Sequence, residues 1–332
     1  MIMSTISLCM ITKNEEAFLE SCLLSVKDLV DEIIVVDTGS TDKTKEIALK
    51  HNAKVFDFAW CDNFAAARNE SLKHATGDWI LILDADEELD KEGINKIKAE
   101  LQNPSFLAYS MPQLHYTNKF MNQANFVQIE NPEFKGFYVS DVVRLFKKDN
   151  QIYFDYCVHE TLRVSLKNAG IKLGEMLSPI HHYQERKGME DVHRKQEFYY
   201  RLSLKNIEQY PTYAKSYHDV GIYFSTYKND QGNALIYCSK AVELEPNNLS
   251  YVLNLSYRLR DLGKLDEAME VLQKVPKDEQ VFRAMGYLYF AKRQFKEARD
   301  AYSEAINLGS PIKERLLSYI KILNTKINEI NK

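Results

Sequence analysis

Residues 79–86 read WILILDAD: five apolar residues run directly into an Asp-Ala-Asp triplet. A short apolar run of this kind is typical of a strand buried on both faces, as in a parallel sheet covered by helices. The segments before it alternate between apolar runs at 6–11, 32–36 and 53–58 and helical patterns at 15–30, 43–51 and 64–74. This order predicts an α/β domain with a mostly parallel, Rossmann-like sheet.

The composition is that of an ordinary globular protein. The 332 residues are 45% hydrophobic, which is enough to fill a core in each of two domains. The 43 basic and 47 acidic residues nearly cancel to a net charge of −4, so a general nucleic-acid binder is not expected. No apolar stretch approaches the roughly 20 residues that span a bilayer, and no basic segment precedes an apolar one at the amino terminus. We therefore expect neither export nor a membrane span, and five scattered cysteines without a CxxC pair predict a reduced, cytoplasmic chain.

Helical repeats are predicted in the second half of the chain. Ala234, Ala268 and Ala298 are spaced 34 and 30 residues apart, close to the 34-residue period of tetratricopeptide helix pairs. The middle unit departs from the pattern at Ser256 and Val275, where small residues are expected. An irregular helical bundle is the alternative, but three units in phase favour the repeats.

The sequence therefore predicts two domains with different architectures. Residues 1–188 form the α/β domain, and residues 189–332 form an all-α tetratricopeptide-repeat domain that the helix at 312–330 caps. Such arrays expose a concave surface that suits extended ligands.

Two of the predicted strands end in acidic residues. The strand at 33–36 runs into Asp37, and the strand at 79–83 runs into Asp84 and Asp86. Ligands of open parallel sheets bind outside the carboxyl ends of the strands. Asp84 and Asp86 are two positions apart and so point to the same side of an extended backbone, where two carboxylates suit Mg2+ or Mn2+. The alternative is a solvated turn in which Asp86 or the following Glu87 caps the next helix.

The loops after the first two strands carry polar side chains as well. Thr12 and Glu15 are placed as a capping box before a helix, in a loop whose backbone could also touch a nucleotide. Asp37 could accept a hydrogen bond from a base, while Ser40 or Asp42 caps the next helix. Neither GxxxxGK[ST] nor GxGxxG occurs, which disfavours P-loop and nicotinamide chemistry.

These motifs together resemble family 2 glycosyltransferases of the GT-A fold. The likeness rests on the runs 12–16, 36–42, 64–69 and 77–87, and extends more loosely through 144–146, 158–160 and 182–183. It is strongest to the branch that joins such a domain to tetratricopeptide repeats and includes sublancin-type peptide S-glycosyltransferases. Lipopolysaccharide-core glucosyltransferases share much of the amino-terminal pattern, so the motifs are specific for the superfamily and not for an acceptor.

The resemblance implies a donor site for a nucleotide sugar. Its residues are Thr12, Glu15 and Asp37 at the nucleoside, Asp84 at the diphosphate and Arg68 at the phosphate or sugar. Arginine suits phosphate oxygens, although a lone helical arginine is more often part of a surface salt bridge.

The resemblance also implies a metal site for Mn2+ or Mg2+. Asp84, Asp86 and His182 are its expected ligands. Where the family has a His-Tyr-Gly-Tyr segment, this chain continues after His182 with Tyr, Gln184 and Glu185, so the histidine agrees and the glycine does not. A partly buried structural histidine beside His181 is the alternative.

An inverting transfer needs a proton acceptor on the acceptor side. We expect Glu160 to be this base, with His159 as its orienter or as an acceptor contact, and Asp141 as the reserve. If the acceptor is a cysteine thiol, whose pKa is about 8.5, the need for a strong base falls.

The resemblance thus implies an inverting, metal-dependent transfer of a hexose or N-acetylhexosamine from a nucleotide diphosphate sugar, expected to be a uridine one. The acceptor is a peptide or protein that the repeats bind, or alternatively a cell-surface glycan such as lipopolysaccharide. Two other classes have less support from the sequence. A peptide-binding scaffold with an inactive sheet domain is disfavoured by the retained Asp84 and Asp86, and a nucleotidyltransferase usually has a glycine- and lysine-rich loop after the first strand, which this chain lacks. The repeats could also serve self-association into a homo-oligomer.

Overall fold

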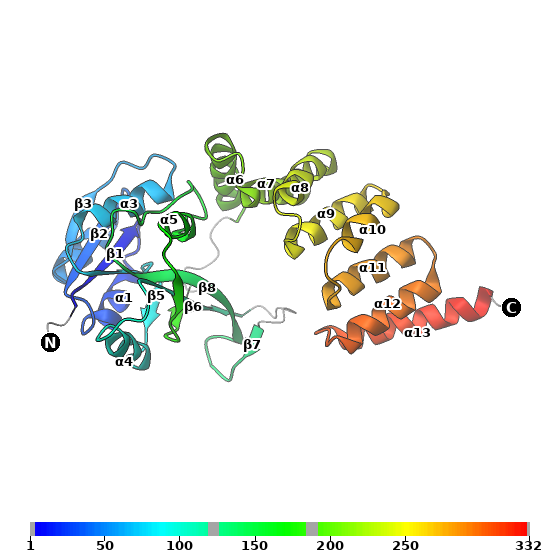
Figure 1. The fold of residues 1–332 in the computed structure, drawn as a ribbon, viewed down its shortest axis with the longest axis horizontal. Coiled ribbons are helices and arrows are strands. Elements are labelled where there is room, and N and C mark those ends of the chain that lie inside the picture. Colours follow the sequence, from blue (N-terminus) through cyan, green and yellow to red (C-terminus); the bar gives the residue numbers. More distant parts are fainter. Residues whose placement is uncertain (1–3, 119–125, 184–191, 331–332) are drawn as a thin grey trace. The chain divides into compact units, whose positions relative to one another are not determined.

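The computed structural model describes residues 4–118, 126–183 and 192–330, and the chain divides into two units, Met1–Glu190 and Asp191–Lys332. Figure 1 shows both, with the sheet in the first unit and only helices in the second. The boundary expected at residue 188 lies outside the described residues, as do Gln184 and Glu185.

One mixed sheet runs through the amino-terminal unit in the order β3-β2-β1-β4-β8-β6-β10-β5, with β7 beside β8 and β9 beside β6. Its strands are β1 (Ile6–Thr12), β2 (Glu32–Asp37), β3 (Lys54–Asp57), β4 (Trp79–Ile82), β5 (Glu87–Leu89), β6 (Ala108–Thr117), β7 (Phe126–Gln128), β8 (Gly136–Lys147), β9 (Leu173–Glu175) and β10 (Ile180–His182). Strands β3, β2, β1 and β4 are parallel, so their carboxyl ends share one edge, and β8 runs antiparallel to both β4 and β6. The predicted α/β class with a Rossmann-like half is confirmed.

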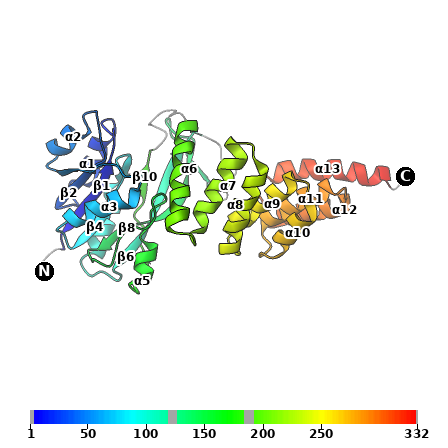
Figure 2. The same cartoon turned by 90° about the horizontal axis from the view of Figure 1, so that it is seen from above.

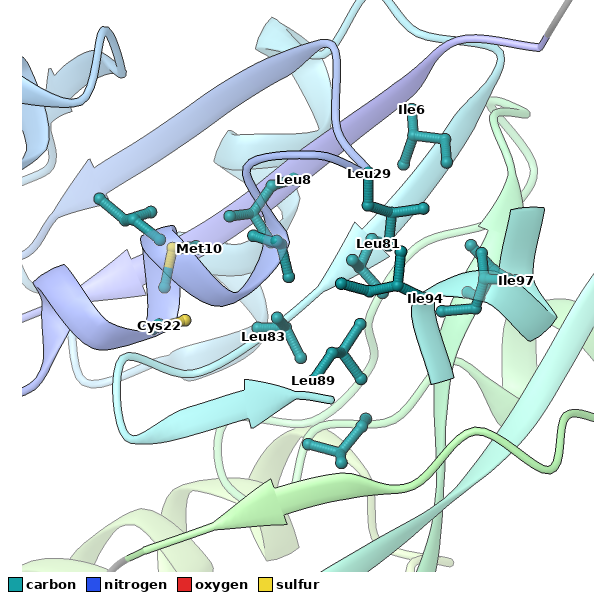
Figure 3. Close-up of a cluster of buried hydrophobic side chains, with 14 of the residues drawn as sticks. Ile6, Leu8, Met10, Cys22, Leu29, Leu81, Leu83, Leu89, Ile94 and Ile97 are labelled. Carbon is teal, nitrogen blue, oxygen red and sulfur yellow. The ribbon is translucent and has the colours of Figure 1, made fainter. Parts of the chain in front are cut away.

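Both faces of the sheet are covered, as the apolar strands predicted. The helices of this unit are α1 (Leu19–Val26), α2 (Thr44–Lys50), α3 (Phe64–His74), α4 (Lys91–Glu100) and α5 (Arg163–Asn168). Leu8 of β1 and Leu81 of β4 lie on one face in a core with α1 and α4 (Figure 3). Ile80 and Ile82 lie on the other face with residues of α3 and α5, because successive strand residues point to opposite sides.

The segment from residue 107 to 182 is more regular than the sequence indicated. The local sequence pattern indicates only short extended pieces such as 139–146, but β6 and β8 are long strands of 10 and 12 residues that pair along their length. Polar residues that face the candidate active site interrupt the apolar alternation of both strands. Alternating hydrophobicity therefore does not identify these strands in the sequence.

The second unit consists of stacked antiparallel helix pairs (Figure 2). Its helices are α6 (Val192–Gln209), α7 (Ala214–Tyr227), α8 (Gln231–Leu244), α9 (Leu249–Asp261), α10 (Leu265–Gln273), α11 (Glu279–Ala291), α12 (Phe295–Asn307) and α13 (Lys313–Ile330). Ala234, Ala268 and Ala298 are fully buried in α8, α10 and α12, at the equivalent place in each pair. Ser256, the polar exception, is buried with its hydroxyl bonded to the carbonyl of Leu253 at 2.7 Å. The helical-repeat architecture is confirmed.

A search of the described helices for a membrane span finds none that combines sufficient length with sufficient apolar character.

Candidate active site

The carboxyl ends of β1 and β2 bring Thr12 and Asp37 side by side. The two residues are register partners in the parallel pair, and both are buried. Oγ1 of Thr12 lies 3.4 Å from Oδ2 of Asp37, while Oδ1 of Asp37 accepts from the backbone amides of Gly39 at 3.0 Å and Ser40 at 2.8 Å. Gly39 has φ +106°, a conformation that favours glycine. Asp37 therefore orders the loop that follows β2, and its contact with a nucleoside stays a prediction.

The loop after β1 is not the start of a helix. α1 begins at Leu19 without a side-chain cap, and Thr12 is the last residue of β1. The predicted capping box of Thr12 and Glu15 is therefore wrong. The amide of Glu15 instead donates to Oγ1 of Thr44, across to the beginning of α2, at 2.7 Å.

Asn14 ties this loop to the one after β2. Its amide donates to Oγ of Ser40 at 2.9 Å, and its Oδ1 accepts from the amide of Thr41 at 2.8 Å. α2 begins without a side-chain cap, so neither Asp42 nor Ser40 is its cap as predicted: Asp42 accepts the amide of Thr44 at 3.0 Å from outside the helix, and Ser40 serves this inter-loop bond. The two loops thus form one ordered wall at the edge of the sheet.

The Asp-Ala-Asp triplet after β4 forms a turn. The amide of Glu87 donates to the carbonyl of Asp84 at 3.0 Å, so the extended backbone predicted here is wrong and the two aspartates have different partners. Oδ2 of Asp86 lies 3.4 Å from Nε2 of His182 on β10. The proposed capping of the next helix by Asp86 or Glu87 is also wrong, since Asp90 caps α4.

Asp84 lies between two buried arginines. Its Oδ1 accepts from Nη2 of Arg68 at 2.8 Å, and its Oδ2 accepts from Nη2 of Arg144 at 2.9 Å. Burial alone would raise the pKa of the Asp84 carboxyl, but the two guanidinium groups outweigh it and hold that pKa well below its usual range. Asp84 is therefore an anion whose two oxygens are both engaged by cations.

Glu87 holds both Arg144 and the backbone of Asp84 in place. It is fully buried, and its Oε1 accepts from Nη2 of Arg144 at 2.7 Å and from Nε2 of Gln113. Its Oε2 accepts from the amide of Asp84 at 2.8 Å. Burial raises the pKa of Glu87 to about 7, although the charge of Arg144 opposes the shift.

His182 meets a second histidine that the sequence analysis missed. His115 is its register partner on β6, and the two Nδ1 atoms lie 2.8 Å apart. Nε2 of His115 lies 2.7 Å from Oγ of Ser140, and its ring stacks on Tyr138. Burial lowers the pKa of His115 to about 4. A prediction that β6 is a strand beside β10 would have identified His115 as the neighbour of His182.

Helix α3 holds the segment that carries the predicted base. Nδ2 of Asn69 donates to the carbonyl of Phe154 at 2.9 Å, and Oδ1 of Asn69 accepts the amide of Phe154 at 2.7 Å. The amide of Phe64, the first residue of α3, donates to the carbonyl of Cys157 at 2.9 Å. The helix therefore fixes the backbone of this segment at two points.

The same helix also fixes the side chain of Glu160. Nε of Arg68 donates to its Oε1 at 2.6 Å. Arg68 is buried, and its Nη1 has no hydrogen-bond partner in the part of the chain that the structure describes. The neighbouring His159 is exposed and has φ +55°. It lies in a loop that is closed by two backbone hydrogen bonds between Asp155 and Thr161. Left-handed backbone at a non-glycine residue is costly and clusters at functional sites.

A cavity of about 320 Å³ lies among these elements. Six of the predicted residues line it: Arg68, Asp84, Asp141, His159, Glu160 and His182. Thr12, Glu15, Asp37 and Asp86 are not among its lining residues. The predicted site is thus divided into the cavity and the ordered loops at the ends of β1 and β2.

Only part of the predicted metal site fits a cation. Both oxygens of Asp84 are held by arginines, so Asp84 does not fit as a ligand. Asp86 and His182 do fit, because their facing atoms lie 3.4 Å apart, near the roughly 3 Å that separates adjacent ligands of a small divalent ion. Within residues 4–118, 126–183 and 192–330, no three or more His, Cys, Asp or Glu side chains gather as a metal cage, so any ion would need ligands from its substrate.

Comparison with known proteins finds similarity in the first unit. Residues 7–156 match the model of Glycosyl transferase family 2. The glycosyltransferase SunS, derived from the SPbeta prophage of Bacillus subtilis, is 31% identical over 158 residues, which are 47% of this chain and 34% of that protein. A TPR repeat-containing protein of Synechococcus elongatus is 50% identical over 109 residues, which are 33% of this chain and 27% of that protein.

This chain spans between 27% and 40% of the length of the curated relatives it matches. Among solved structures, residues 1–349 of TarS from S. aureus align over 93% of this chain and 90% of that one, with a TM-score of 0.42 and 17% identity.

Proposed function

We propose that the chain, whose residues 7–156 match the model of Glycosyl transferase family 2, is an inverting, metal-dependent glycosyltransferase acting on a peptide or protein. One observation carries the proposal. A cavity beside the carboxyl ends of the strands contains a buried arginine, Arg68, that bridges the family's Asp84 to a carboxylate on the opposite wall, Glu160. Such a bridge aligns the leaving-group side and the acceptor side of one reaction.

The proposed donor is a nucleotide diphosphate sugar, a uridine diphosphate hexose or N-acetylhexosamine. Nη1 of Arg68 supports this choice: it is buried and has no partner among the residues that the structure describes, and such a guanidinium nitrogen is suited to an anionic oxygen of a diphosphate. In this proposal the loops that hold Thr12, Glu15 and Asp37 receive the nucleoside.

Asp86 and His182 would hold Mn2+ or Mg2+. When bound, the ion supplies positive charge to the leaving diphosphate. The chain adds its own charge there through Arg68 and Arg144, which the carboxylates of Asp84 and Glu87 hold in fixed positions before substrate arrives. Charge that is fixed in advance stabilises a transition state without a reorganisation cost.

Glu160 is the proposed base. Oε1 of Glu160 accepts from Arg68, and Oε2 has no hydrogen-bond partner among the described residues. Oε2 can therefore accept the proton of an acceptor hydroxyl or thiol. Asp141 and His159 line the same cavity and remain the alternatives.

The acceptor is proposed to bind the repeats. The stacked pairs α7–α8, α9–α10 and α11–α12 have the architecture that presents extended surfaces to peptides. Five cysteines without a CxxC pair support a cytoplasmic location, where thiols stay reduced.

Calorimetry of uridine diphosphate tests the donor and metal assignments together. We expect Mn2+ to strengthen nucleotide binding in the wild type and to have no such effect in Asp86→Ala. Asp57→Ala is the matched control, since Asp57 ends β3 at the same edge and is exposed in a salt bridge with Lys45. Equal Mn2+ dependence in the wild type and Asp86→Ala would contradict the metal assignment. Asp37→Ala should weaken nucleotide binding while Mn2+ dependence persists.

A further inference from the structure

We propose that His115 is a positioning residue that fixes the ring and the proton arrangement of His182. The consequence of this role for sugar transfer rests on the proposed function, but the proton arrangement of His182 follows from hydrogen bonds alone. His115 belongs to none of the motifs that pointed to the site. It lines the cavity and reaches His182 through Nδ1 at 2.8 Å.

The direction of the hydrogen bonds is set at Glu87. Arginine can only donate, so Oε1 of Glu87 is an acceptor toward Arg144. A backbone amide can only donate, so Oε2 is an acceptor toward the amide of Asp84. The ionised carboxylate of Glu87 can only accept, so the side chain of Gln113 must face it with its amide nitrogen, and the oxygen of Gln113 points away toward Ser140.

The chain then continues in one direction. The single proton of the Ser140 hydroxyl goes to Oε1 of Gln113 at 3.3 Å, so Oγ of Ser140 accepts from Nε2 of His115 at 2.7 Å. A neutral His115 that carries its proton on Nε2 offers a lone pair on Nδ1. Nδ1 of His182 must therefore carry the proton that lies between the two rings.

This assignment decides which nitrogen of His182 faces Asp86. With one proton held on Nδ1, Nε2 of His182 is the nitrogen that faces Asp86, and the proposed cation would sit there in place of a second proton. Without an acceptor at Nδ1, the ring could instead carry its proton on Nε2 and block a ligand there. Histidine ligands generally depend on such a second partner, whose loss typically costs about 10–100-fold in metal affinity.

Packing holds His115 itself in place. Its ring stacks on Tyr138 with centroids 4.5 Å apart, and the His182 ring meets it edge-on at 4.9 Å. The opposite face of the same strands provides a natural control. There His181 meets the hydroxyl of Tyr116 at the same 2.8 Å distance, and adjacent strand residues point to opposite sides of the sheet.

The test compares His115→Phe, His115→Asn and His181→Phe in the full chain. Asparagine places an amide oxygen near the position of Nδ1 and keeps an acceptor there, whereas phenylalanine keeps only the ring. The first readout is the ¹⁵N NMR spectrum of histidine-labelled, metal-free protein, with the signals of His182 assigned by their loss in His182→Ala. The second readout is Mn2+ affinity without donor, measured by electron paramagnetic resonance.

We expect Nδ1 of His182 to be protonated in the wild type, in His181→Phe and in His115→Asn, and to lose this preference in His115→Phe. Mn2+ affinity should fall at least about tenfold in His115→Phe and stay within about threefold in the other two. Unchanged His182 signals in His115→Phe would overturn the inference. If the wild type binds no Mn2+, the metal assignment of the proposed function fails, and the NMR comparison still decides the role of His115.

Discussion

Nε of Arg68 lies 2.6 Å from Oε1 of Glu160, a residue 92 positions further along the chain. The bond crosses the cavity wall from α3 to the loop that follows β8. Since Nη2 of the same arginine holds Asp84, one side chain sets the distance between the two carboxylates that the proposed chemistry needs. A cation that is shared between two acids holds both side chains in fixed positions.

Glu160→Gln should abolish turnover and preserve the cavity. The glutamine oxygen still accepts from Arg68, but the side chain no longer takes a proton. With a hydroxyl acceptor we expect kcat to fall by at least about 100-fold while donor affinity stays within about threefold. Steady-state transfer and nucleotide calorimetry measure the two quantities.

Asp141→Asn is the matched control for this prediction, because Asp141 lines the same cavity on the exposed side of β8. It should retain turnover. If Asp141→Asn loses activity while Glu160→Gln keeps it, the base is Asp141 and the role given to Glu160 is wrong.

The sequence predicted those parts of the site that follow directly from local order. Helix α3 begins and ends at the expected residues 64 and 74, and the acids follow the buried strand β4 as expected. The partners of those acids could not be read in the same way. Arg144 reaches Asp84 only because β8 pairs antiparallel with β4, and His115 reaches His182 only through the register of β6 and β10. Such contacts depend on strand pairing over long sequence separations, which local spacing does not encode.

The amino-terminal unit should lose stability in acid through Glu32. Burial opposes its charge, but hydrogen bonds from Lys54, Ser7 and Thr76 outweigh burial and lower the pKa of Glu32 to about 2, from an ordinary value near 4.5. Because the folded-state pKa is the lower one, the ionised carboxylate stabilises the fold above about pH 4.5, and this stabilisation is lost as the pH falls toward 2.

We therefore expect Glu32→Gln to be less stable than the wild type at pH 6, with a gap that narrows as the pH falls to 3.5. Urea unfolding followed by tryptophan fluorescence measures this selectively, because both tryptophans of the chain, Trp60 and Trp79, lie in the amino-terminal unit. A gap that stays constant between pH 6 and 3.5 would show that another interaction accounts for the effect of the substitution.

Gly286→Ala should destabilise the repeats. Gly286 lies in α11 where a Cβ atom would overlap the ring of Tyr302 in α12. Relief of the overlap must move the ring or separate the helices, and overpacking of this kind costs about 1–3 kcal/mol. Thermal unfolding followed by far-UV circular dichroism measures the loss.

Gly232→Ala is the control for this prediction. Gly232 lies at the start of α8, where a Cβ atom would meet only Oδ1 of Asp230 at 3.5 Å. Alanine also favours the helix more than glycine does, so this variant should be as stable as the wild type or more so. Equal losses in the two variants would refute the packing argument for Gly286.

The most direct test of the proposed glycosyltransferase activity is nucleotide release from a panel of nucleotide sugars, without acceptor, in the presence of Mn2+. We expect slow release of uridine diphosphate from one uridine diphosphate sugar in the wild type, and none above background with chelator or in Asp86→Ala. No release from any donor in the panel, or the same release in the wild type and in Asp86→Ala, would contradict the account.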